Sequence, residues 1–389
     1  MKNLINKYEQ KCISNRLASK NDIFIAGLNT ETIWNQDGQK NIELEKIFSA
    51  LNINSLMFVK PMEPYFSIIE YLIDHSDGTI YPTDTETRTF LHDLPIVDGF
   101  DIEKIIQRLK HRKCVIEKGE GIITWGSVTP EQAYIFFSCV CFTCFVKFFV
   151  DCVNDNRLGK LTEKQSDVLK KSINLLKKIN PNFKPLKTNI KTEKDVYEAI
   201  AEAGEIVVNY GLVDSFFGNV SYKHNSILYI SQTGSSLDEL EGCIDPCPLD
   251  DSSCSSITAS SEFSAHKEIV LNNPDIKGLL HGHPKFTVIM SMYCEKEECA
   301  FLDKCHIKCP EIRHIENIPI VCGEVGTGIY GLCNTLPKAI KGKRAVIVYG
   351  HGVFAAVDHD FNNSFRTIID IEKICQDKYF DLLGISESL

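Results

Sequence analysis

The sequence lacks three features that would point to particular classes of protein: low-complexity segments, a positive net charge and a long uninterrupted apolar run. Its formal net charge is −10, which is the wrong sign for nucleic acid or an anionic membrane surface. A local basic pocket for one phosphate remains compatible with this average. We therefore expect neither nucleic acid nor a membrane among its partners.

A secretion signal is also missing from the start of the sequence. The first residues, MKNLINKYEQ, are polar and lack an apolar core followed by small residues. The most apolar stretch, residues 134–150, contains Ser138, Thr143 and Lys147 and is slightly short for a membrane span. We predict a buried helix there and a cytoplasmic protein.

Cysteine, by contrast, is abundant, with 16 among 389 residues. In a reducing compartment, cysteines are more often buried apolar residues or metal ligands than disulfides. Four of them, Cys139, Cys141, Cys144 and Cys152, stand among Phe and Val and are expected to pack in a core.

Short segments recur in the same order in the two halves of the chain. The pairs are 22–25 with 227–230, 93–97 with 317–321, 112–123 with 343–354 and 147–149 with 378–380. The offset grows along the chain, so a duplicated domain with a shorter first copy is predicted. We expect domains at residues 1–155 and 191–389, joined by a linker at 156–190 that contains one helix. Strands and helices alternate in the second copy, which indicates an α/β fold.

Three histidines in the second copy have the spacing of a metal site. His281 and His283 follow an apolar strand expected at 276–280, and alternate residues of a strand point to the same side. His351 stands between two glycines after another expected strand, 344–349. Three imidazoles hold zinc and leave a coordination position open, as in catalytic sites. Glu262, on an expected helix nearby, adds a carboxylate.

These residues belong to a series of segments that resembles the class II aldolase/adducin family, in particular its L-fuculose phosphate aldolase branch. In order, the segments are Gly218–Ser221, Thr233–Gly234, Ser260–His266, His281–His283 and Gly350–Gly352. The resemblance covers nearly all of the second half. It implies a three-layer α/β/α domain with a mainly antiparallel central sheet.

The resemblance also implies roles for individual residues. His281, His283 and His351 match zinc ligands, although another divalent metal is possible, and Glu262 matches the acid/base. The residues that match phosphate-binding loops are Gly218, Asn219, Thr233, Gly234, Ser260 and Ser261. Small residues and hydroxyls suit such loops, since backbone N–H groups can then approach the anion. A partly desolvated carboxylate beside a metal is expected to have a raised pKa.

The implied activity is that of a zinc-dependent aldolase acting on a small phosphorylated sugar or sugar acid through a metal-stabilised enediolate. A homo-oligomer is implied as well. Alternatives are a 4-epimerase or dehydratase of the same family, or a non-catalytic, adducin-like interaction protein. Glu262, where epimerases tend to carry Asp, favours the aldolase. The tyrosine that donates a proton in family members has no clear match here; Tyr330 and Tyr379 are substitutes by residue type only.

The first copy has lost these histidines. If Pro64 is set against Pro284, Pro61 and Glu63 stand at the H-x-H positions, and Glu120 stands opposite His351. We predict a similar fold without a catalytic zinc. Such a domain either completes the active site of the second copy or only stabilises the chain.

A cysteine cluster in the second copy is a candidate second metal site. Cys294, Cys299, Cys305 and Cys309 stand in a polar insertion that the first copy lacks, with His306 beside them. Their spacing is not that of a standard zinc finger. A structural zinc or an iron–sulfur cluster is the hypothesis.

Overall fold

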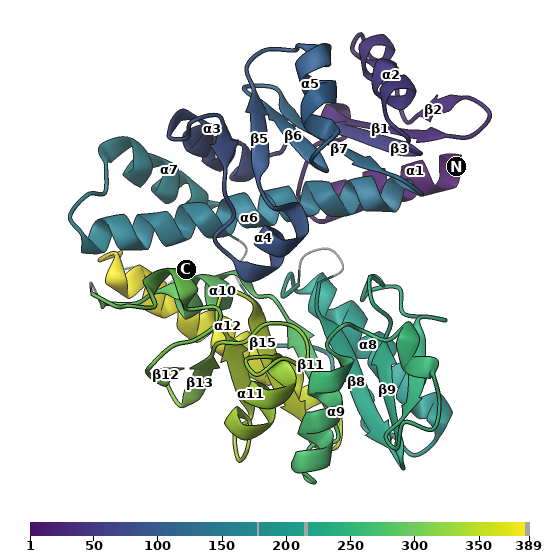
Figure 1. Cartoon of the computed structure of the whole chain (residues 1–389), viewed down its shortest axis with the longest axis vertical. Helices are drawn as coiled ribbons and strands as arrows, with labels where there is room; N and C mark the ends of the chain where they lie inside the picture. Colours follow the sequence, from purple (N-terminus) through teal and green to yellow (C-terminus); the bar gives the residue numbers. More distant parts are fainter. Residues whose placement is uncertain (177–178, 214–216, 297, 386–389) are drawn as a thin grey trace. The chain divides into compact units, whose positions relative to one another are not determined.

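The computed structural model describes residues 1–176, 179–213, 217–296 and 298–385 (Figure 1). The chain divides into two compact units, Met1–Lys177 and Lys178–Leu389. The division falls within the segment predicted as the linker. The helix of that segment packs on helices of the first unit, so this part of the linker belongs to the first unit.

The second unit is built around one eight-stranded sheet. Its main elements are α8 (Glu193–Asn209), β8 (Asn219–His224), β9 (Ile227–Ser231), β10 (Ile244–Pro248), α9 (Phe263–Asn272), β11 (Gly278–Gly282), α10 (Lys285–Met292), β12 (Arg313–Ile315), β13 (Ile318–Val321), α11 (Leu332–Ala339), β14 (Ala345–Val348), β15 (Gly352–Val357) and α12 (Phe361–Leu382). The strand order is β10-β9-β8-β11-β15-β14-β13-β12. Only the pair β13–β14 is parallel among the pairs of this sheet that the structure describes. The sheet is therefore mixed but mainly antiparallel, as expected.

Helices cover both faces of this sheet. On one face, α10 and α12 pack on each other and on the central strands, with α8 beside them. On the other face, α9 and α11 pack on each other over a core that includes Ile269, Leu336 and Phe354. All five residues of β11 are buried because helices lie on both sides of it. The expected three-layer α/β/α arrangement is confirmed.

The first unit has the same strand order without the extra edge strand. Its elements are α1 (Lys2–Ser14), β1 (Ile23–Leu28), β2 (Thr32–Trp34), α2 (Asn41–Ala50), β3 (Ser55–Val59), α3 (Tyr65–Asp74), β4 (Thr79–Ile80), α4 (Thr85–Leu91), β5 (Leu94–Val97), α5 (Ile102–Leu109), β6 (Cys114–Glu117), β7 (Gly121–Gly126), α6 (Pro130–Arg157) and α7 (Glu163–Asn174). The order β2-β1-β3-β7-β6-β5-β4 matches β9-β8-β11-β15-β14-β13-β12 strand for strand. The parallel pair β5–β6 also falls where β13–β14 does. The units share a topology; their origin by duplication stays a prediction.

Sheet register corrects two of the sequence alignments. β1 takes the place of β8, not of β9, so the pairing of residues 22–25 with 227–230 is wrong. On the neighbouring strand, Phe58 pairs with Ile123 as His281 pairs with Phe354. Phe58 therefore stands at the position of His281, and not Pro61. Alignment on the two prolines failed because the connection from strand to helix is longer in the first unit.

An ion pair in the first unit stands where the second unit has its carboxylate and third histidine. Lys40 precedes α2 as Glu262 precedes α9, and its Nζ lies 3.0 Å from Oε2 of Glu120. The same ammonium lies 3.4 Å from buried Glu117 and over the ring of Phe58 at 4.7 Å. Burial raises the pKa of the Glu117 carboxyl, and Lys40 opposes this shift. Lys40 is thus the cation that compensates a buried carboxylate.

We expect Lys40→Met to destabilise the first unit by about 1–3 kcal/mol, because it leaves the buried Glu117 carboxylate without its charged partner. Chemical denaturation measures this. Lys46→Met on the same helix removes an exposed pair with Glu43 and should change stability by less than about 1 kcal/mol. Equal effects of the two substitutions would contradict the role given to Lys40.

The apolar stretch at residues 134–150 is a buried helix, as predicted. In the described part of the chain, α6 is the one helix long and apolar enough to cross a membrane, and 94% of its apolar window is buried inside the fold. Its cysteines, Cys139, Cys141, Cys144 and Cys152, are buried, as expected of residues in a core.

Candidate metal centre

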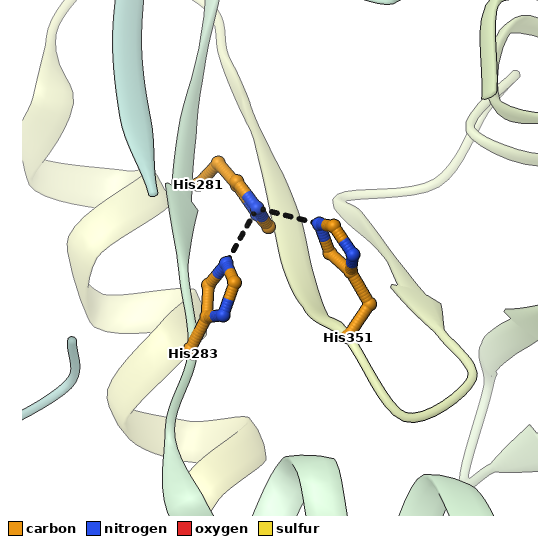
Figure 2. Close-up of side chains that lie close together, drawn as sticks. All are labelled: His281, His283 and His351. Carbon is orange, nitrogen blue, oxygen red and sulfur yellow. Dashed lines mark hydrogen bonds between the residues drawn. The ribbon is translucent and has the colours of Figure 1, made fainter. Parts of the chain in front are cut away.

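Three imidazoles from two neighbouring strand ends of the second unit converge on one point (Figure 2). His281 lies within β11, His283 just after its end, and His351 in the turn between β14 and β15. Nε2 of His281 lies 2.9 Å from Nε2 of His283 and 3.2 Å from Nε2 of His351. Ligands at 2.0–2.1 Å from a tetrahedral zinc ion lie about 3.3 Å apart. The spacing of the three nitrogens is therefore close to what one ion requires.

Backbone contacts and burial keep these rings ready to bind a cation. Nδ1 of His281 lies 2.9 Å from the carbonyl oxygen of Val353 and donates its proton there, which leaves the lone pair on Nε2. The ring also stacks on Phe354. Burial, followed by the neighbouring His281 and His351, holds the pKa of His283 well below its ordinary value. Neutral imidazole is the form that binds a metal, so the residues fit a divalent cation.

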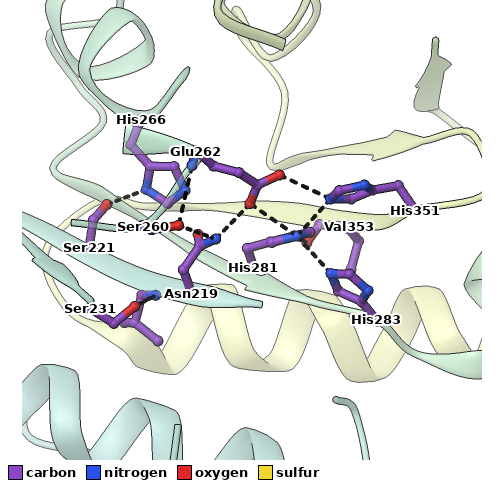
Figure 3. A network of polar contacts seen from close by, with 11 residues as sticks. Asn219, Ser221, Ser231, Ser260, Glu262, His266, His281, His283, His351 and Val353 are labelled. Carbon is purple, nitrogen blue, oxygen red and sulfur yellow. Dashed lines mark hydrogen bonds and ion pairs between the residues drawn. The ribbon is translucent and has the colours of Figure 1, made fainter. Parts of the chain in front are cut away.

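Glu262 lies beside this triad, as the network in Figure 3 shows. Its Oε1 is 3.0 Å from Nε2 of His351 and its Oε2 is 3.4 Å from Nε2 of His281. The residue immediately precedes α9 and is 4% exposed. The carboxylate predicted on a helix near the histidines is thus within contact distance of two of them.

The pKa of the Glu262 carboxyl shifts in the direction opposite to the expected one. Burial favours the neutral acid, but the adjacent His281 and His351 outweigh it and lower the pKa of the Glu262 carboxyl. The sequence analysis predicted a raised pKa because it weighed desolvation without the contacts that the carboxylate makes with His281 and His351. Glu262 is therefore an ionised carboxylate, the form that can accept a proton.

The residues matched to phosphate loops separate into two groups. Asn219 and Ser260 are buried and hold Glu262: Nδ2 of Asn219 donates to Oε2 of Glu262 at 2.6 Å and to Oγ of Ser260 at 3.0 Å. Gly218 has φ +85°, and a Cβ there would lie 2.5 Å from the carbonyl oxygen of His281. A side chain at this position would therefore collide with the backbone of β11, which explains the glycine without a phosphate contact.

The second group consists of Thr233, Gly234 and Ser261, which are exposed. An antiparallel bridge between Gln232 and Ala259 brings these two segments side by side. Ser261 also lies just before the N-terminus of α9, where backbone N–H groups favour an anion. These three remain the available candidates for a phosphate contact.

Sequence comparison agrees with this geometry. The profile of the family described as "Class II Aldolase and Adducin N-terminal domain" matches residues 198–379. The second unit is a class II aldolase/adducin domain. Comparison with curated proteins finds no significant match.

Solved structures that are similar to the chain include two aldolases and one class II aldolase domain. L-fuculose-1-phosphate aldolase from Thermus thermophilus is 20% identical with a TM-score of 0.40, covering 50% of this chain and 98% of that chain. Sugar-phosphate aldolase from Thermotoga maritima is 20% identical with a TM-score of 0.36, covering 50% and 98%. The N-terminal class II aldolase domain of a conserved Thermoplasma acidophilum protein is 12% identical with a TM-score of 0.36, covering 51% and 99%. Because the identities are 20% or lower and the TM-scores are 0.40 or lower, these similarities do not indicate which substrate this chain binds.

Helix α10 of the aldolase/adducin domain links the two parts of the metal centre, which the sequence analysis missed. At its start, just after His283, the buried Glu372 accepts N–H bonds from Phe286 at 2.9 Å and Thr287 at 2.7 Å. At its end, Oγ of Ser291 accepts the N–H of Gly350 at 2.8 Å, beside His351. The one sign of this contact in the sequence was Glu372 itself, an acidic residue on the apolar face of α12.

Arg313 completes the attachment of α10. Its guanidinium donates to the carbonyl oxygens of Ser291 at 2.7 Å and Tyr293 at 2.8 Å, and it lies over the ring of Tyr349 at 5.4 Å. The helix is therefore held at both ends. Its contacts therefore connect the H-x-H segment with the turn that carries His351.

We expect Glu372→Ala to lower stability by about 2–4 kcal/mol, since two N–H groups in the first turn of α10 lose their acceptor inside the fold. Zinc affinity should fall as well, because His283 directly precedes this turn. Denaturation and competition with a zinc chelator measure the two effects. The matched control is Asp377→Ala, which changes an exposed acidic residue on α12, the helix that also carries Glu372. An unchanged zinc affinity in a folded Glu372→Ala protein would contradict the coupling.

His266 contacts Oγ of Ser221 at 2.7 Å through Nδ1, and burial lowers its pKa to about 3. Its ring lies near Glu262 in Figure 3 and is not among the three converging imidazoles. Tyr379 is fully buried against Phe286, whereas Tyr330 is 40% exposed. Burial therefore argues against Tyr379 as a residue that meets a substrate.

Proposed function

We propose that the protein is a zinc-dependent aldolase that cleaves or forms a C–C bond in a small phosphorylated sugar or sugar acid. One observation carries this proposal: three buried imidazole Nε2 atoms converge, with the Glu262 carboxylate 3.0 Å from one of them. Structural zinc sites use four protein ligands, whereas three leave a position open to substrate. The family match over residues 198–379 supports the reaction class.

The chain's own residues would divide the chemistry between them. A divalent cation held by His281, His283 and His351 would act as a Lewis acid toward negative charge developing on a substrate oxygen. Glu262 is ionised and buried beside His351, so it would take a proton from a substrate carbon or hydroxyl. Asn219 holds the carboxylate in place through the 2.6 Å hydrogen bond.

A phosphate group would be bound on the exposed side of the site by Thr233, Gly234 and Ser261. Gly234 has φ +70°, a conformation that glycine adopts at little cost, and its lack of a side chain leaves room for an anion beside the backbone. The N-terminus of α9 adds a favourable dipole. This arrangement favours a phosphorylated substrate over a neutral sugar. The homo-oligomer and the cytoplasmic location stay predictions.

The test is a screen of retro-aldol cleavage over phosphorylated ketoses and sugar acids, with zinc present and Glu262→Gln as the negative control. Aldehyde release by the parent protein but not by the variant would support the proposal. Epimerised product without cleavage would indicate the 4-epimerase, and loss of water would indicate the dehydratase. Binding of zinc without turnover on any substrate would favour a non-catalytic, adducin-like protein.

We expect Thr233→Ala and Ser261→Ala to raise KM by about 10–100-fold and to change kcat by only a few-fold, because each removes a hydroxyl from a charged phosphate rather than from the proton transfer. Steady-state kinetics on the substrate found in the screen gives both constants. Ser253→Ala, an exposed serine outside these segments, is the control. A fall in kcat at unchanged KM would place these hydroxyls in the chemical step instead.

A further inference from the structure

The connection between α10 and β12 carries four of the cysteines and has no counterpart of similar length in the first unit. It spans residues 293–312, whereas α3 and β4 are joined by residues 75–78 alone. A fifth cysteine, Cys322, follows β13. Connections this long are uncommon in compact domains unless they serve a function or are held together by something other than a core.

Core packing does not explain these five cysteines. Each of Cys294, Cys299, Cys305, Cys309 and Cys322 is partly buried, whereas the cysteines of α6 are fully buried. All five are free thiols. Their thiols are therefore partly accessible to solvent. Partial exposure suits a metal ligand better than a residue that fills space in a core.

Backbone contacts bring parts of this segment together around sulfur atoms. The N–H of Cys309 points to Sγ of Cys322 at 3.2 Å, and the N–H of Phe301 points to Sγ of Cys299 at 3.4 Å. The N–H of Gly323 donates to the carbonyl oxygen of His306 at 3.0 Å, which ties the two stretches of chain together. N–H groups aimed at sulfur stabilise the thiolate, the form that binds a metal.

Four of these thiols are electrostatic neighbours of one another. Burial raises the pKa of Cys305; Arg313 opposes the shift, and Cys309, Cys299 and Cys294 add to it. Sγ of Cys305 donates to the carbonyl oxygens of Phe301 and Leu302, each at 3.2 Å. Within the described ranges, the only three ligand atoms found within 4.8 Å of one another are those of the histidine triad. A cation would have to draw the sulfurs together as it replaces their protons.

We propose that Cys299, Cys305 and Cys309, with Cys294 or Cys322 as the fourth ligand, close on one zinc ion that fastens the 293–312 connection to the domain. Four thiolates in a tetrahedral arrangement form a closed structural site for zinc. Binding releases the thiol protons to solvent and changes no oxidation state. This site does not rest on the proposed aldolase activity.

The experiment measures metal on the full-length protein, purified under reducing conditions and loaded with zinc alone. We expect about two zinc ions per chain in the parent protein, about one in Cys305→Ser/Cys309→Ser and about one in His351→Ala, because each change opens one site. Cys254→Ser, which removes an exposed thiol outside the segment, should leave the content unchanged. If His351→Ala loses metal but Cys305→Ser/Cys309→Ser keeps as much as the parent, the histidines bind metal and the proposed cysteine site does not.

Cobalt replaces zinc in a second measurement that reports the ligand atoms. We expect a sulfur-to-cobalt charge-transfer band in the parent and in His351→Ala, and its loss in Cys305→Ser/Cys309→Ser. Comparison of Cys294→Ser with Cys322→Ser then identifies the fourth ligand by which one weakens the band. No such band, a band unaffected by the double substitution, disulfides among these cysteines, or bound iron with sulfide would each overturn the assignment.

Discussion

Glu262→Gln is expected to lower turnover by about 10²–10⁴-fold, the loss typical of removing a general base. Glutamine keeps the size of the side chain and can still accept the hydrogen bond from Asn219, so fold and zinc content should be retained. What it loses is the negative charge that lies 3.0 Å from His351 and that accepts a proton from substrate. Single-turnover and steady-state rates, measured with metal content on the same samples, test this.

The control for this experiment is Glu268→Gln, which makes the same chemical change on α9 away from the histidines. It should leave turnover within a few-fold of the parent. If Glu262→Gln were as active as the parent, Glu262 would not be the base and the proposed mechanism would be wrong. If the variant lost its zinc instead, Glu262 would be a metal ligand in the resting protein rather than a free base.

His351→Ala and His281→Ala are each expected to remove about one equivalent of zinc per chain and to abolish turnover, because two imidazoles alone hold the ion weakly. The comparison is best made in the Cys305→Ser/Cys309→Ser background, so that the cysteine segment does not contribute to the count. Zinc bound to the native state also stabilises it by mass action. In the Cys305→Ser/Cys309→Ser background, a chelator should therefore lower the Tm of the protein that keeps all three histidines and leave that of the His351→Ala variant unchanged.

His359→Ala is the matched control, since His359 is an exposed histidine between β15 and α12. It should keep its zinc, its turnover and the response of its Tm to the chelator. Unchanged zinc content in both His281→Ala and His351→Ala would show that the three converging nitrogens are not the metal centre.

The metal ligands were accessible from the sequence because their pattern is local. H-x-H after an apolar strand places two imidazoles on one side, and a histidine between glycines after another strand marks a turn beside the sheet. The hairpin β6–β7 was matched to β14–β15 correctly because both have the same length. Where the connection length changes, as between Phe58 and Pro64, sequence alignment assigned the wrong residues, and only hydrogen-bond register corrected them.

Sequence alone thus determined the fold class, the histidine triad and, through the resemblance, the carboxylate beside it. Tertiary structure alone decided what holds these groups: the contact of Asn219 with Glu262, and the attachment of α10 by Glu372 and Ser291. It also decided the direction of the Glu262 pKa, which depends on two histidines distant in the chain. The physical reason is that spacing and periodicity report neighbours within one element. Buried charges and hydrogen bonds instead join residues far apart in the chain, as with Asn219 and Glu262, 43 positions apart, and Phe286 and Glu372, 86 positions apart.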